Sequence, residues 1–267
     1  MDIYNFNPEL ILSLLLTLMR ISVVLFLMPV FNTGSLPIQL KASISLVLTL
    51  AIWPHAALAG TDMPLHPLSV GLMLLGEALL GLIMGMAVQF LFFGIQSGGE
   101  LLGFQMGFTM VNIADPLSGA QNGAVGYLLW MVSILTFLTL NGHLFMIKAL
   151  ADSFRLVPAG GLLLGEVLVR QVFDLSAQIF ILALKIAAPV MVALFLTELA
   201  LGLMNRVAPQ MQVMLIGFPL KIAAGFFFLG LLLVILSSEI EQFVIGMNPM
   251  LLNLLKAGSP SFHEMAP

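Results

Sequence analysis

The stretch from residue 77 to residue 100 reads EALLGLIMGMAVQFLFFGIQSGGE and has no charged side chain between its two terminal glutamates. A helix needs about 20 apolar residues to cross the hydrocarbon core of a bilayer, and this run is long enough. It lacks the alternation of polar and apolar residues that a barrel strand shows. The stretch therefore predicts a membrane helix.

Similar apolar runs occur along most of the chain. They lie near residues 10–31, 42–60, 68–96, 124–151, 175–204 and 211–246. These runs predict an all-α integral membrane protein with about six long apolar helices. Pro189 and Pro219 fall inside the last two runs, where each removes a helical hydrogen-bond donor. We therefore expect kinked or broken helical hairpins.

Composition excludes several classes of function. The 267-residue chain is 60% apolar and 8% charged, whereas a soluble domain is roughly 45–50% apolar and about 25% charged. A net charge of −4 leaves no basic patch for nucleic acid. The chain has no cysteine, and its four histidines show no metal-ligand spacing. Because no nucleophile, base and carboxylate group together in the sequence, we expect no enzyme, no cofactor and no metal.

Charges inside the apolar runs are candidates for a structural role. Arg20 lies at the centre of the first run, where a charge costs roughly 2.5–3.5 kcal/mol or more. An ion pathway and buried pairs that fix the register of an assembly are both possible. Each run carries only one or two such groups, which favours pairing. The set is Arg20, Glu77, Lys185, Glu198, Arg206 and Lys221.

A polar stripe precedes the fifth run. Glu166, Arg170, Asp174 and Gln178 follow one another at steps of four residues. On a helix this spacing predicts a solvated or interfacial face with ion pairs between neighbouring turns.

No internal domain boundary is visible. We expect one membrane-embedded module over residues 1–257 and a C-terminal tail over 258–267. The pattern Glu-x-x-Leu-Gly-Leu begins at both Glu77 and Glu198. Apolar sequences often contain such matches by chance, so this repetition is only a hint of two related hairpins.

The most distinctive stretch covers residues 98–123, GGELLGFQMGFTMVNIADPLSGAQNG. Its glycines and the Asp115–Pro116 turn signal predict that it leaves regular helix. Apolar irregular backbone is tolerated at membrane depth only where protein or a cavity surrounds it. Phenylalanines and methionines recurring at steps of four suit an apolar seal. The alternative is an ordinary helix packed through Gly103 and Gly107. Candidate loop residues are Gly103, Phe104, Met106, Gly107, Phe108, Met110, Asp115, Pro116 and Gly119.

Several motifs resemble the FliR family of flagellar export-gate proteins, whose relatives also serve virulence-associated type III secretion. The first hairpin of the family is similar to Arg20-Ile21-Ser22, Pro29-Val30-Phe31, Pro37 and Lys41. Its central loop is similar to the stretch with Gly103-Phe104, Gly107, Asp115-Pro116 and Gly119. Later motifs are Asn141-Gly142-His143, Ser153-Phe154 with Pro158, Arg206-x-x-Pro209-Gln210 and residues 217–222, GFPLKI. The resemblance spans residues 20 to about 225.

The resemblance implies a non-enzymatic subunit of a hetero-oligomeric helical gate in the bacterial inner membrane, within the flagellar basal body. Its implied partners are FliP and FliQ homologues, FlhB and FlhA homologues, and membrane lipid. Unfolded flagellar subunits would pass through the gate, and the central loop, here Met106 to Asn122, would plug it. The chain itself would join a FliP-like N-terminal part to FliQ-like C-terminal hairpins. A stand-alone transporter or channel, or the gate subunit of a virulence-type system, is the alternative.

Overall fold

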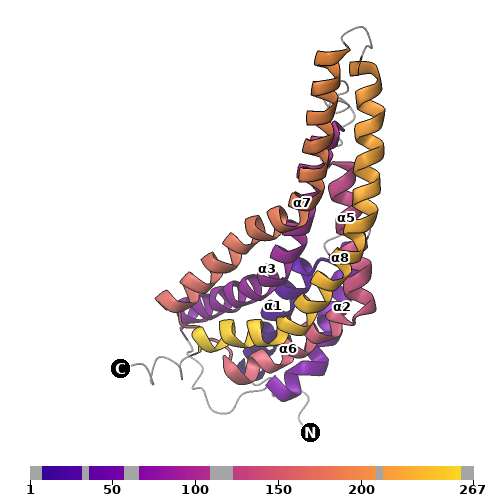
Figure 1. Ribbon diagram of the computed structural model, residues 1–267. Coiled ribbons are helices and arrows are strands. Elements are labelled where there is room, and N and C mark those ends of the chain that lie inside the picture. The colour runs from indigo at the N-terminus through magenta and orange to yellow at the C-terminus, as the bar shows by residue number, and fades with distance from the viewer. Residues whose placement is uncertain (1–7, 32–35, 57–65, 109–122, 209–212, 260–267) are drawn as a thin grey trace. The chain divides into compact units, whose positions relative to one another are not determined.

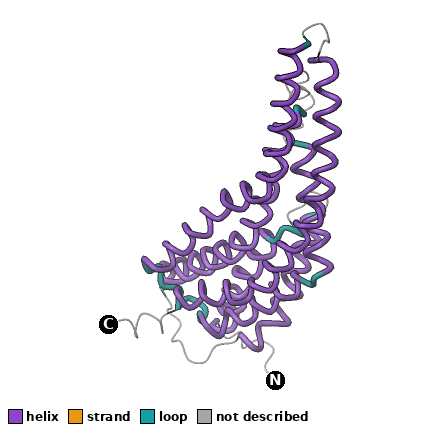
Figure 2. Tube along the Cα trace, viewed as in Figure 1, coloured by secondary structure: helices purple, strands orange, loops and turns teal. Residues whose placement is uncertain are grey.

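The computed structural model describes residues 8–31, 36–56, 66–108, 123–208 and 213–259 (Figure 1). Within these ranges every regular element is a helix, and short connections join them (Figure 2). The helices are α1 (Pro8–Leu27), α2 (Ile38–Ala56), α3 (Pro67–Met106), α5 (Ala124–Thr139), α6 (Gly142–Leu156), α7 (Glu166–Val207) and α8 (Val213–Ala257). The predicted all-helical fold is confirmed.

Membrane-spanning length is reached by fewer segments than the six apolar runs. In the described part of the chain, α1, α3, α7 and α8 are long and apolar enough to cross a bilayer. The bent pair α5 and α6 adds a fifth span if it is counted as one. The run near 42–60 forms a shorter apolar helix, Ile38–Pro54. The fourth run is divided between α5 and α6.

Among the described residues, a sharp bend separates α5 from α6. The helices α5 and α6 meet at a bend of 67°, where Asn141 adopts a left-handed φ of 57°. By contrast, α7 continues through Pro189 and α8 continues through Pro219. Neither proline therefore breaks its helix, because one missing N–H group interrupts only a single hydrogen bond. The expectation of kinked or broken hairpins holds for the bent pair α5 and α6.

The chain divides into two compact units, and α3, α7 and α8 contribute residues to both. The first unit comprises residues 1–89, 141–175 and 244–267, and the second comprises 90–140 and 176–243. In the first unit, α1 buries Leu16, Ile21 and Val24 completely or nearly so. In the second, Phe92 and Phe137 join α3 to α5 through an edge-to-face contact of 5.4 Å between ring centroids.

Glycines set how closely α3 and α5 approach within the second unit. A Cβ atom on Gly99 would lie 2.6 Å from the Cα atom of Gly126, which is too close for any side chain. A Cβ on Gly103 would lie 3.6 Å from the nearest atom of Val125, an ordinary contact. The tightest packing is therefore at Gly99 and Gly126, one turn before the Gly103–Gly107 pair that the sequence suggested.

We expect Gly99→Ala to destabilise the protein and Gly103→Ala to be tolerated. The first change forces the backbones of α3 and α5 apart, and overpacking of this kind typically costs about 1–3 kcal/mol. The second places a methyl group in available space and adds helix propensity. Thermal melting of the purified protein in detergent measures both. Equal melting temperatures for the two variants would contradict the close helix approach.

Candidate functional site

Among the described residues, the most buried charges are Arg20 of α1 and Glu77 of α3, and they form an ion pair. Arg20 is 0% exposed and Glu77 is 1% exposed. The Nε atom of Arg20 donates to Oε2 of Glu77 at 2.6 Å, and its Nη2 atom donates to Oε1 at 3.0 Å. This two-point geometry is the strongest form of arginine–carboxylate contact. The pair is made within one chain and needs no second subunit.

A third segment completes this buried ionic cluster. Arg20 also donates to Ser153 Oγ at 3.1 Å and to the carbonyl oxygen of Val157 at 3.0 Å. The backbone N–H of Gly160 donates to Oε1 of Glu77 at 2.8 Å. The ring of Phe154 lies under the guanidinium, with its centroid 4.1 Å from Cζ of Arg20. The cluster thus joins α1 and α3 to the end of α6 and to the connection that follows it.

Sequence reasoning missed most of these partners. Val157 and Gly160 contribute backbone atoms, which leave no side-chain signal. Gly160 takes a φ of +76°, a conformation that glycine adopts without strain. Ser153, Phe154 and the neighbouring Pro158 did stand out as a motif, but nothing in the sequence connected that motif to Arg20.

Two further ion pairs link α7 to α8 inside the second unit. Lys185 Nζ lies 2.7 Å from Glu239 Oε1, and Lys221 Nζ contacts Glu198 Oε1. These pairs are more exposed than the Arg20 cluster, since the Lys185 side chain is 59% exposed. Arg206 is exposed and forms no ion pair with the residues that the structure describes. Glu198 and Lys221 also line a cavity of about 300 Å³ between the two helices.

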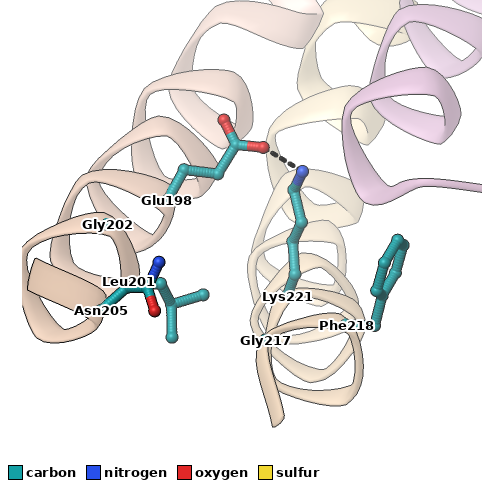
Figure 3. A pocket seen from close by; sticks show the side chains of 7 residues that line it. All are labelled: Glu198, Leu201, Gly202, Asn205, Gly217, Phe218 and Lys221. Atoms are coloured by element: carbon teal, nitrogen blue, oxygen red, sulfur yellow. Dashed lines mark hydrogen bonds and ion pairs between the residues drawn. The ribbon is translucent and has the colours of Figure 1, made fainter. Parts of the chain in front are cut away.

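Figure 3 shows how that cavity is built. The Glu198–Lys221 contact bridges the two helices, and Leu201 and Asn205 reach from α7 toward α8. Gly202 and Gly217 contribute no side chain, which leaves the space open. In the described ranges, no group of three or more metal-ligating side chains exists. The cavity therefore offers both polar and apolar contact surface.

The start of the candidate loop is helical. Residues 98–106 continue α3, so the expectation that irregular backbone begins at residue 98 was wrong for this part. The helix stops at Gly107, which has a φ of +91°. The N–H of Gly107 donates to Phe104 O and the N–H of Phe108 donates to Gly103 O, both at 3.0 Å. This is a Schellman motif, in which a left-handed glycine ends the helix.

The residues at this helix end pack against α8. Met106 is fully buried, and a Cβ on Gly225 would lie 2.5 Å from its Cε atom. Phe108 meets Phe226 edge to face at 6.0 Å between ring centroids. Phe104, in contrast, is 68% exposed. The remaining candidates, Met110, Asp115, Pro116 and Gly119, lie outside the described residues.

The polar stripe at the start of α7 has the expected geometry. Glu166 and Arg170 form an ion pair at 3.6 Å between neighbouring turns, and both side chains are largely exposed. Asp174 and Gln178 are also exposed. The stripe forms an exposed face of α7.

These features define a class: an integral membrane protein whose interior charges join helices to one another. Over residues 11–247 the chain matches the family described as "Bacterial export proteins, family 1", and it belongs to this family, that of the flagellar biosynthetic protein FliR. It is accordingly a membrane component of a flagellar export system and not an enzyme.

Curated relatives cover most of the chain. The flagellar biosynthetic protein FliR of Pectobacterium carotovorum subsp. carotovorum is 33% identical over 246 residues, which are 91% of this chain and 92% of the relative. The FliR protein of Escherichia coli K12 is 31% identical over 225 residues, covering 84% and 85%. The Yop proteins translocation protein T of Yersinia pestis is 28% identical over 193 residues, covering 71% and 72%.

We expect Arg20→Ala to destabilise the folded chain strongly. The change leaves the Glu77 carboxylate buried without its partner, and we expect it to lower the free energy of unfolding by about 3–5 kcal/mol. The control is Arg170→Ala, whose exposed pair contributes about 1 kcal/mol or less. Melting of the purified protein and its level in membranes are the measurements.

A double variant separates the pair from simple loss of packing. Replacing both Arg20 and Glu77 with methionine removes both charges, so we expect a smaller loss than either single methionine variant gives. If the double variant lost the sum of the two single losses, the two residues would not be coupled.

Proposed function

We propose that this chain is a subunit of the flagellar protein export gate, assembling with FliP and FliQ homologues around the channel for unfolded flagellar subunits. FlhB and FlhA homologues would contact this assembly in the inner membrane. The α7–α8 hairpin would be the FliQ-like part and the preceding helices the FliP-like part. The observation that carries the proposal is the apolar surface of α7 and α8, which extends further than a bilayer can cover.

The length of this surface follows from the exposed residues of α7. Large apolar side chains are exposed from Val167 to Val207, 40 residue steps apart. At 1.5 Å per residue this is about 60 Å of helix, while the hydrocarbon core of a bilayer is about 30 Å thick. Within the most apolar window, only 28% of α7 and 22% of α8 are buried in the chain, compared with 61% of α3. Other protein surfaces are needed to cover the remainder.

The two ion pairs between α7 and α8 also support coverage of this hairpin by partner subunits. Lys185 and Glu198 are 13 residue steps apart on α7, which corresponds to about 20 Å. A bilayer centred on the apolar stretch between them would therefore enclose charged groups in hydrocarbon. Coverage by partner helices avoids this cost.

We expect the chain to purify as one hetero-oligomer when it is co-expressed with the FliP and FliQ homologues of the same bacterium. Native mass spectrometry of the detergent-solubilised sample measures its composition. Val234→Asp, at a side chain that is 74% exposed on α8, should reduce the yield of this complex several-fold. Ser237→Asp, at an exposed polar position three residues further on, is the matched control.

A homogeneous lone chain, with no unlike subunit bound under co-expression, would contradict the gate-subunit proposal. It would instead favour a transporter or channel that acts alone.

We also propose that the segment after Gly107 acts as the plug of the closed gate. Support comes from the family and from the exposed Phe104 at the end of α3. The Schellman motif at Gly107 fixes where the segment leaves the helix, and the packing of Met106 and Phe108 on α8 holds that point in place. Met106 has a packing role in this arrangement, so the seal would be formed by residues beyond it together with partner subunits.

We expect replacement of residues 109–122 by a short Gly/Ser linker to open a leak while the complex still assembles. The deletion retains Gly103 to Phe108, so the end of α3 keeps its packing. Conductance of the purified complex in a planar bilayer is the measurement. Phe104→Ser should give a smaller leak, because it removes one exposed apolar group. A deletion complex as closed as wild type would show that the segment is not the plug.

A further inference from the structure

A cluster of polar and aromatic side chains on α3 and α5 has no role in the features described so far. It consists of Gln96 and Glu100 on α3 and of Tyr127 and Trp130 on α5, all in the second unit. We call it the acid–aromatic cluster. The whole chain contains only two tryptophans and two tyrosines, so the presence of one of each at this place calls for an explanation.

The carboxylate of this cluster has no positive partner in the chain as described. Gln96 Nε2 donates to Glu100 Oε1 at 3.2 Å, one turn away on the same helix. Glu100 is exposed, and among the described residues no lysine or arginine forms an ion pair with it. A bilayer interior would supply no counter-charge to a carboxylate on an apolar helix. Glu100 therefore faces water or a cation from another molecule.

Glycine at position 126 allows the stem of Glu100 to pack against α5, the helix that carries the aromatic pair. A Cβ on Gly126 would lie 2.8 Å from Cγ of Glu100 and 3.0 Å from the carbonyl oxygen of Gln96. The stem of Glu100 thus lies directly on α5 at Gly126, the residue that precedes Tyr127 in the sequence. Tyr127 and Trp130 stack with their ring centroids 5.7 Å apart and an interplanar angle of 24°.

A carboxylate packed on the helix that carries two stacked aromatic rings is suited to an organic cation. The carboxylate accepts charge-assisted hydrogen bonds, and the faces of tryptophan and tyrosine attract a guanidinium or ammonium group. Glu100 also retains an oxygen for which no hydrogen bond is recorded among the described residues.

The surroundings of the cluster favour a protein as the source of that cation. Exposed large apolar side chains flank it on both helices: Phe93, Leu101 and Phe104 on α3, and Leu128 and Met131 on α5. Apolar and aromatic residues grouped around a single polar anchor are typical of the central part of a subunit interface.

We propose that the acid–aromatic cluster binds a lysine or arginine side chain of a neighbouring gate subunit and so fixes the position of that subunit on α3 and α5. This inference rests on the proposed function, because it requires neighbours. Glu100 accepts hydrogen bonds from the incoming cation, and Tyr127 and Trp130 cover its face.

Charge reversal tests the proposal in the co-expressed complex. We expect Glu100→Arg to reduce the yield of assembled complex at least tenfold, and Glu100→Gln to reduce it several-fold, while the membrane level of the chain itself is unchanged. Glu166→Arg and Glu166→Gln, at an exposed carboxylate on α7, are the matched controls and should assemble like wild type. Wild-type yield of the Glu100→Arg complex would overturn the inference and leave the gate-subunit proposal intact.

Photo-crosslinking identifies what occupies the cluster. Benzoylphenylalanine in place of Tyr127 preserves an aromatic side chain on α5, one residue after the contact between Gly126 and Glu100. On irradiation of the assembled complex we expect an adduct with a neighbouring subunit, and we expect Glu100→Arg to abolish it. An adduct with phospholipid or with an export substrate would overturn the inference. If no complex forms even with the unmodified chain, it is the proposed function that fails.

Discussion

The ion pair between Arg20 and Glu77 is the constraint on which the first unit depends. Two opposite charges removed from water are stable only when nearly every donor and acceptor has a partner. Arg20 meets this requirement with a carboxylate, a hydroxyl, a backbone carbonyl and an aromatic face. These partners come from three separate parts of the chain, so α1, α3 and the connection after α6 must come together for any of them to be satisfied.

The second unit uses charge in a different way. Its ion pairs connect α7 to α8 at exposed or half-exposed positions, where water or a neighbouring protein reduces the cost of charge. They therefore set the register of the two helices more than they add stability. The same unit exposes large apolar side chains along α7 and α8 and carries Glu100, which has no ion pair among the described residues. The first unit thus satisfies its buried charges internally, while the second presents both apolar and charged groups to its surroundings.

The sequence was sufficient for the helical fold, because runs such as 77–100 have no other stable form in a membrane. It also marked Arg20, Glu77, Glu198 and Lys221 as charges that need partners, but it did not indicate which residues pair. The repeated Glu-x-x-Leu-Gly-Leu pattern shows why the sequence alone does not identify the pairs. At Gly81 a Cβ would lie 3.0 Å from the carbonyl oxygen of Arg20, whereas at Gly202 nothing lies within 4 Å. The same residues are thus buried in one place and face open space in the other, a difference that only tertiary packing decides.

The glycine that ends α3 affects which parts of this sequence can vary during evolution. The Gly103–Phe108 turn closes its own hydrogen bonds, and Met106 and Phe108 pack against α8. The described contacts of this helix end therefore lie within α3 and α8. Substitutions in the following segment that leave these contacts in place would preserve the end of α3, so we expect the sequence of the segment to vary more freely during evolution than the residues that anchor it.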